Sequence, residues 1–69
     1  MFQSIESMRR AMEATQHELD IIRERGWSAW EDYYEAFIDT EHRESYVSTL
    51  EAQLGLLQRE LTRRLGGVA

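Results

Sequence analysis

The apolar positions in the first third of the chain follow a helical repeat. Spacings of three and four residues separate Ile5, Met8, Met12, Thr15, Leu19 and Ile22. This spacing places them along one face of a helix. Ser4 can cap the start of this helix, and Gly26 can end it just after Arg23 and Arg25, whose positive charges suit a helix C-terminus.

A second helical pattern begins directly after Gly26. Ser28 and Glu31 have the spacing of a capping box, which marks a helix start. The chain has no Pro, and only Gly55 weakens the helix before the Gly66-Gly67 pair that can end it. One long, nearly uninterrupted second helix is therefore predicted.

These patterns predict an all-α fold, a two-helix antiparallel hairpin with a longer second helix. We place helix one at about 4–25, the turn at 26–28 and helix two at about 29–65, in one domain over 1–69. At about 1.5 Å per residue the two helices measure roughly 33 Å and 55 Å. The first helix is therefore too short to cover the second.

The far part of the second helix carries a row of apolar residues that we call the leucine seam. It consists of Val47, Leu50, Leu54, Leu57, Leu61 and Leu65. Each buried Leu contributes about 1.5 to 3 kcal/mol, and so small a domain has little stability to spare. We therefore predict a homodimer with this seam as the interface, in a four-helix bundle or a coiled coil, with parallel and antiparallel arrangements both open.

Aromatic residues gather around the predicted turn. On a helical wheel Tyr34 and Phe37 lie within about 40° of Trp30, which predicts an inward stripe that anchors helix one. Trp27 in the turn and Tyr33 on the leucine side have no such core position. Because Trp, Tyr and Arg dominate interface hot spots, we predict a protein-docking surface here. Its candidate residues are Trp27, Tyr33, Arg23, Arg25, Trp30 and Tyr34.

A polar stretch, residues 39–45, interrupts the apolar pattern of the second helix. Thr40, Glu41 and Glu44 occupy positions where core residues would otherwise fall. We interpret the stretch as a solvated bend in the pattern. A polar register device or a partner site is the alternative.

Charge and composition narrow the possible partners. The chain has thirteen acidic residues, eight Arg and no Lys, which gives a net charge of −5. Nucleic-acid binding is therefore not expected, and a basic partner fits better. The absence of Cys excludes disulfides and Cys-type zinc sites. No stretch approaches the ~20 apolar residues of a membrane span, and the start lacks the apolar run of a signal peptide, so we expect a cytoplasmic protein without membrane contact.

Two pairs have spacings that could place metal ligands on one helix face. Glu13 with His17, and Asp39 with His42, resemble the Glu-x-x-His element of ferritin-like di-iron bundles. The wheel places His17 about 140° from the seam of helix one, toward solvent. No catalytic triad or Gly-rich phosphate loop is present. We therefore expect no metal, no cofactor and no enzymatic activity.

Two resemblances concern function. The stretch MRRAMEATQHELDIIRER resembles the first helix of bacterial chorismate mutases, which enclose their substrate with Arg and Lys from three helices; here Lys is absent and no third helix is predicted. In size, two-helix layout and the Arg25-Gly26 turn, the chain resembles the small needle co-chaperones of type III secretion. Phage-encoded regulators of host proteins share this layout.

The prediction for function is a small non-enzymatic adaptor, co-chaperone or inhibitor that acts as a helical homodimer on a larger protein. The alternative is a structural coiled-coil component of a phage particle or a cytoskeletal complex, in which the leucine seam is the functional part. A nucleic-acid-binding bundle regulator is a third possibility, which the acidic charge disfavours.

Overall fold

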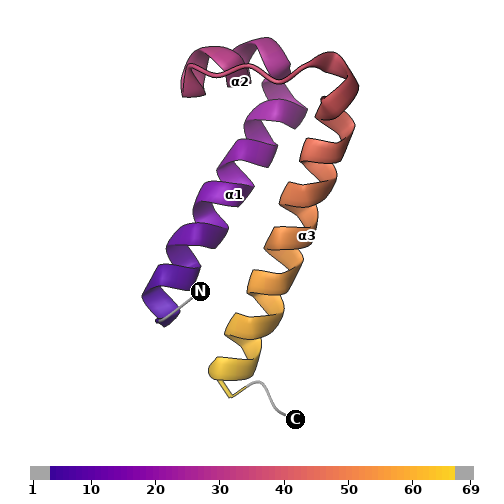
Figure 1. Ribbon diagram of the computed structural model, residues 1–69. Helices are drawn as coiled ribbons and strands as arrows, with labels where there is room; N and C mark the ends of the chain where they lie inside the picture. The colour runs from indigo at the N-terminus through magenta and orange to yellow at the C-terminus, as the bar shows by residue number, and fades with distance from the viewer. Residues whose placement is uncertain (1–3, 67–69) are drawn as a thin grey trace.

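The computed structural model describes residues 4–66, which form three α-helices and no strand. They are α1 (Ile5–Arg25), α2 (Trp27–Tyr34) and α3 (Thr40–Arg64). In Figure 1, α1 and α3 lie side by side and antiparallel, and α2 lies across one end of the pair. The all-α prediction is confirmed, whereas the single long second helix is wrong.

The first helix has the predicted ends. The Ser4 hydroxyl accepts a hydrogen bond from the Ser7 N–H at 3.0 Å, as an N-cap should. Gly26 has a φ of 94°, which only Gly adopts without strain, and its N–H donates to the carbonyls of Ile21 and Ile22 at 3.0 and 3.1 Å. The turn after α1 is therefore specified by local sequence.

The second predicted helix breaks at residues 35–39. The first part, α2, begins at Trp27, so Ser28 lies inside the helix and does not cap it. α2 ends at Glu35, which adopts the left-handed conformation with φ 51° and ψ 47°. Residues 36–39 are not helical, and α3 follows with Asp39 at its N-cap. The Gly67 of the predicted stop lies outside the described residues.

This break changes which residues face each other. With residues 27–39 folded aside, α1 has 21 residues and α3 has 25, so the two helices match in length. Side-chain contacts join Arg23 to Glu51 and Glu18 to Tyr46, so the end of α1 lies beside the first half of α3. A continuous second helix would instead have paired the end of α1 with residues 27–34.

The core lies between α1 and α3, with a contribution from α2. Its fully buried side chains are Met8, Leu19 and Leu57, and the other buried apolar residues are Ile21, Trp30 and Leu50. The expectation that the first helix is too short to cover the far leucines is therefore wrong for Leu57, which is fully buried. The dimeric bundle or coiled coil stays a prediction.

The rest of the leucine seam is only partly covered. Val47, Leu54 and Leu61 are half-buried, and Leu65, just past the end of α3, is exposed. None of the helices within residues 4–66 has both the length and the apolar character that a bilayer crossing requires.

Candidate protein-docking surface

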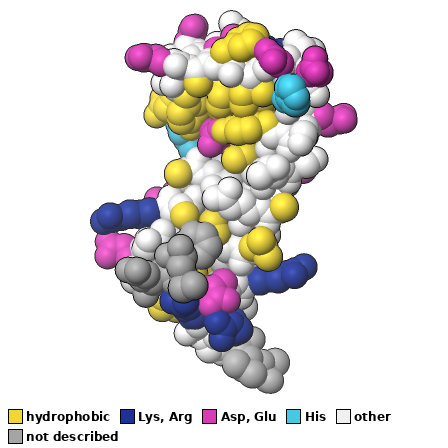
Figure 2. All heavy atoms as spheres, in the orientation of Figure 1, with side chains coloured by type: hydrophobic (Ala, Val, Ile, Leu, Met, Phe, Trp, Pro, Cys, Tyr) yellow, Lys and Arg dark blue, Asp and Glu magenta, His cyan; other side chains and the backbone are white. Residues whose placement is uncertain are grey.

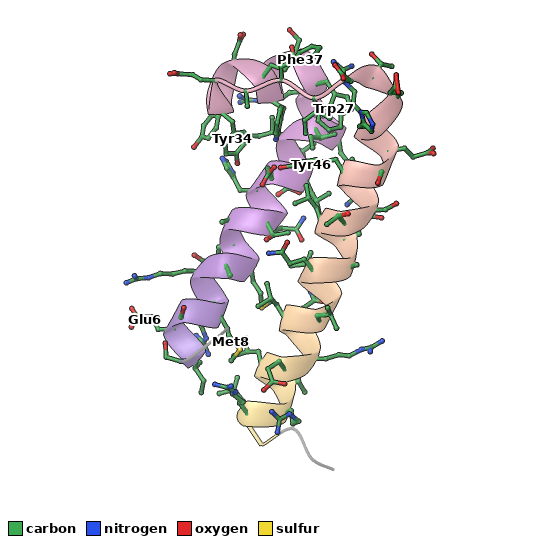
Figure 3. All side chains as sticks on the ribbon, in the orientation of Figure 1. Glu6, Met8, Trp27, Tyr34, Phe37 and Tyr46 are labelled. Atoms are coloured by element: carbon green, nitrogen blue, oxygen red, sulfur yellow. The ribbon has the colours of Figure 1, made fainter. Side chains whose placement is uncertain are left out.

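An aromatic cluster fixes α2 to the two long helices. Trp30 lies at its centre, only 3% exposed, as the predicted inward stripe requires. Its ring centroid is 5.3 Å from that of Trp27, 5.5 Å from Tyr34 and 5.6 Å from Tyr46. Figure 3 shows Trp27, Tyr34 and Tyr46 together at the α2 end of the molecule. Aromatic pairs of this kind add about 0.5 to 1.5 kcal/mol beyond the area they bury.

One carboxylate on α1 accepts hydrogen bonds from two polar groups of this cluster. Glu18 accepts a hydrogen bond from the indole N–H of Trp30 at 3.1 Å and another from the hydroxyl of Tyr46. Burial and this hydrogen bond raise the pKa of Tyr46 well above its ordinary value. Burial, followed by the negative charge of Glu18, also raises the pKa of Tyr34. We call Glu18, Trp30 and Tyr46 the Glu18 network.

Arg43 of α3 binds both α2 and residues 35–39, which we call the linker. Its Nη2 donates to Glu31 of α2 at 3.0 Å, and its Nε donates to the Ile38 carbonyl at 3.0 Å. Its guanidinium carbon also lies 5.2 Å from the centre of the Trp27 ring, a cation–π distance. Arg43 therefore joins three segments that are separate in the sequence.

Sequence reasoning missed Glu18, Arg43 and Tyr46. One available signal was the spacing of Arg43 and Tyr46, which places both on one face of a helix. A second signal was the position of Tyr46. It directly precedes the leucine seam and is separated in the sequence from the aromatic residues at 27–37. Nothing in the spacing alone could show that Glu18 lies opposite.

Two large aromatic side chains of this region point outward. Tyr33 is 61% exposed and Phe37 is 67% exposed. Phe37 lies in the linker, on the outer side of the molecule in Figure 3, so its predicted place in the inward stripe is wrong. The Tyr33 ring makes edge contacts with the rings of His17 at 5.2 Å and Tyr34 at 4.8 Å. We refer to α2 and residues 35–39 together as the cap.

The predicted partner-binding residues are divided between two environments. Trp27 lies in α2 rather than in a turn, and it is half-buried within the aromatic cluster, as is Tyr34. Tyr33 is the most exposed aromatic residue of the set. Arg23 pairs with Glu51 across the α1–α3 contact, away from Tyr33.

Arg25 does lie with Tyr33, beside an open pocket of about 250 Å³ between α1 and α2. The pocket is lined by His17, Asp20, Ile21, Glu24, Arg25 and Tyr33. Ile21 forms an apolar part of this lining and is buried, and Asp20 accepts a hydrogen bond from Gln16 at 2.9 Å. The structure thus brings Arg25 and Tyr33 to one surface and leaves Arg23 outside it.

The candidate metal pairs stay on the surface. The Asp39 carboxylate and the His42 ring are 3.9 Å apart and exposed, and Glu13 and His17 are exposed on α1. Within residues 4–66 no group of three His, Cys, Asp or Glu could hold a metal ion.

The resemblance to chorismate mutases has to be revised in one respect. A third helix exists, contrary to the sequence prediction, although Lys is still absent. The acidic partners of three Arg are Glu6 for Arg10, Glu51 for Arg23 and Glu31 for Arg43. These guanidinium groups thus already have carboxylate partners within the chain.

Comparison with known proteins finds no matching family model, no matching curated protein and no matching solved structure. The functional assignment therefore rests on the geometry of the cap.

Proposed function

We propose that the protein is a non-enzymatic binding module, an adaptor, co-chaperone or inhibitor, that docks on a larger protein through its cap. The observation that carries the proposal is the outward position of Tyr33 and Phe37, both more than half exposed. Figure 2 shows hydrophobic side chains gathered at the same end of the molecule. Aromatic side chains that a fold leaves outside are the residues most often found as anchors in protein interfaces.

The construction of the cap supports this role. The Trp30 cluster and the Arg43 contacts hold α2 in place. A surface that is already ordered loses little conformational entropy on binding, which favours affinity. In the bent chain the cap therefore presents its two outer rings on a fixed support.

The charge of the chain favours a basic partner. Asp32 and Glu35 are exposed on the cap near the two rings, and the whole chain carries −5. Complementary charge accelerates association and disfavours partners of like charge. A basic surface with an apolar recess for an aromatic ring is the chemistry that fits.

A homodimer is part of the proposal, as the sequence predicted. Leu65, a large apolar residue of the predicted seam just past the end of α3, is exposed and supports a contact between copies. In the bent chain Leu50 and Leu57 are buried, which disfavours both a dimer contact through these two residues and the alternative of a purely structural coiled coil built on the whole leucine seam.

The test is affinity capture with three immobilised proteins: wild type, the double variant Tyr33→Ser/Phe37→Ser, and Leu56→Ser. The control removes an apolar side chain that is 63% exposed but lies outside the cap. We expect a partner recovered by wild type and Leu56→Ser, released by salt, and reduced at least about tenfold with the cap variant. Equal recovery of every captured protein by all three would contradict the proposal.

A further inference from the structure

The linker that separates α2 from α3 contains no residue that forbids a helix. Residues 35–39 are Glu, Ala, Phe, Ile and Asp, without Gly or Pro. Ala, the residue type at position 36, has the highest helix propensity of all amino acids. Glu35 nevertheless has φ 51°, in the left-handed region that non-glycine residues adopt rarely. The bend is therefore imposed by contacts made elsewhere in the chain.

Those contacts exist only when the chain is bent. Arg43 binds Glu31, twelve residues away, and the rings of Trp30 and Tyr46 lie 5.6 Å apart although sixteen residues separate them. In a straight helix these separations would be about 18 Å and 24 Å. Opening the bend breaks both contacts, so these contacts stabilise the bent form relative to the open one.

We propose that residues 35–39 are a hinge, and that opening it fuses α2 and α3 into one helix over 27–64 whose α3 part is covered by α1 of a second copy. Straightening α2 into line with α3 carries α1, attached at Gly26, away from its own α3. Leu50 and Leu57 then need a new cover. The surface that fits them is α1, and a second copy supplies it.

A second copy is favoured because exchange of α1 remakes contacts that already exist. Met8 and Leu19 of one chain bury the seam of the other, and Arg23 again meets Glu51. Exchanging an identical element between copies is a low-cost route to a dimer. This inference rests on the homodimer in the proposed function and names how it forms. Partner binding through the fixed cap belongs to the bent chain, in which the Trp30–Tyr46 and Arg43–Glu31 contacts are intact.

The open form has a different length. The longest dimension of the bent chain is 41 Å. A continuous helix of about 38 residues, from 27 to 64, measures roughly 57 Å. Small-angle scattering can therefore distinguish the open form from the bent one independently of mass.

Two substitutions at one position separate the two forms. Asp39 has φ −53°, which the Pro ring tolerates, and within residues 4–66 its N–H makes no backbone hydrogen bond. Asp39→Pro thus fits the bent form and interrupts the continuous helix. Asp39→Ala removes the same carboxylate but permits the helix. Glu35→Gly is a second blocking variant, because Gly accepts the left-handed conformation and weakens a helix.

The experiment is sedimentation equilibrium over a wide concentration range, with circular dichroism to establish that each variant is folded. We expect wild type and Asp39→Ala to dimerise with a longer maximum dimension, and Asp39→Pro to dimerise at least about a hundredfold more weakly. Glu35→Gly should, like Asp39→Pro, dimerise more weakly than wild type. If folded Asp39→Pro or Glu35→Gly dimerises as strongly as wild type, the hinge proposal is wrong, whereas the homodimer proposal still stands. Monomers throughout would overturn both, while capture of a partner by the cap would still be measurable.

The exchange of α1 has its own readout. Chains with Arg23→Glu or Glu51→Arg carry like charges at the Arg23–Glu51 contact when each folds alone. In a mixed dimer with exchanged α1 helices, both contacts regain opposite charges. We expect native mass spectrometry of the mixture to show a larger share of heterodimer than random pairing of the two variant chains would give. A purely statistical distribution would overturn the exchange.

Discussion

The two ends of the molecule are held together in different ways. The α1–α3 pair, away from the cap, relies on buried aliphatic side chains such as Met8 and Leu57, whose attraction has no preferred direction. The cap relies on directed contacts, in which Glu18 and Arg43 each bind two groups on other segments. Large aromatic side chains are exposed at the cap end. The difference fits the proposed division, in which the helix pair supplies stability and the cap docks on a partner.

The largest effect is expected in the helix pair. Leu57→Ala removes a fully buried side chain between α1 and α3 and should lower the free energy of unfolding by about 2 to 5 kcal/mol. Leu56→Ala, its neighbour, alters a side chain that is 63% exposed and should change it by less than about 0.5 kcal/mol. Urea denaturation measures both. Similar losses for the two would mean that α1 does not cover α3.

The Glu18 network comes next. Glu18→Ala leaves the buried Trp30 N–H without its acceptor and should lower the free energy of unfolding by about 1 to 3 kcal/mol. Glu18→Gln keeps an acceptor oxygen at the same place, so its loss should be clearly smaller. Equal losses from the two variants, measured by chemical denaturation at neutral pH, would show that the side-chain volume matters and the hydrogen bonds do not.

A smaller effect is expected from alkaline pH. Because the pKa of Tyr46 is higher in the folded chain than its ordinary value, the folded state holds this proton more tightly. The associated stability is intact below about pH 10 and is lost as pH rises further. The chain has no Lys or Cys, so tyrosines dominate titration in this range. Tyr46→Phe should flatten the decline of unfolding free energy above pH 10, with a residual slope from Tyr34; an unchanged slope would contradict this assignment.

The smallest effect should come from the outer face of the cap. Tyr33→Ser and Phe37→Ser change exposed side chains, and each should alter the free energy of unfolding by less than about 0.5 kcal/mol. Thermal and urea denaturation of the single variants provide the check. A loss above about 1 kcal/mol in either would assign that ring a structural role and remove it from the docking surface.

Periodic and local features of the fold could be predicted from the sequence. The seam of α1 follows from its spacing, and Ser4 and Gly26 end that helix through contacts with near neighbours. The bend at residues 35–39 could not be predicted in this way. It depends on Arg43 and Glu18 meeting residues 12 to 28 positions away, and no Gly or Pro marks it.

The polar stretch at residues 39–45 was the available signal for the bend. The stretch predicts an interruption of the apolar pattern, and α3 begins within it, with Asp39 at the N-cap and Glu41 in the first turn. Missing the full break also misplaced two aromatic residues. Trp27 lies half-buried in the aromatic cluster instead of in a turn, whereas Phe37 lies at the surface instead of in the inward stripe.

Amide hydrogen exchange of residues 37–39 tests most directly that the chain bends between α2 and α3. Within the described part of the chain, the N–H groups of Phe37, Ile38 and Asp39 donate no backbone hydrogen bond. In the dilute monomer we predict fast exchange at these three amides, next to protected amides within α3. Unbroken protection from α2 into α3 would contradict the bend, because it would mean one long helix with its leucine seam uncovered.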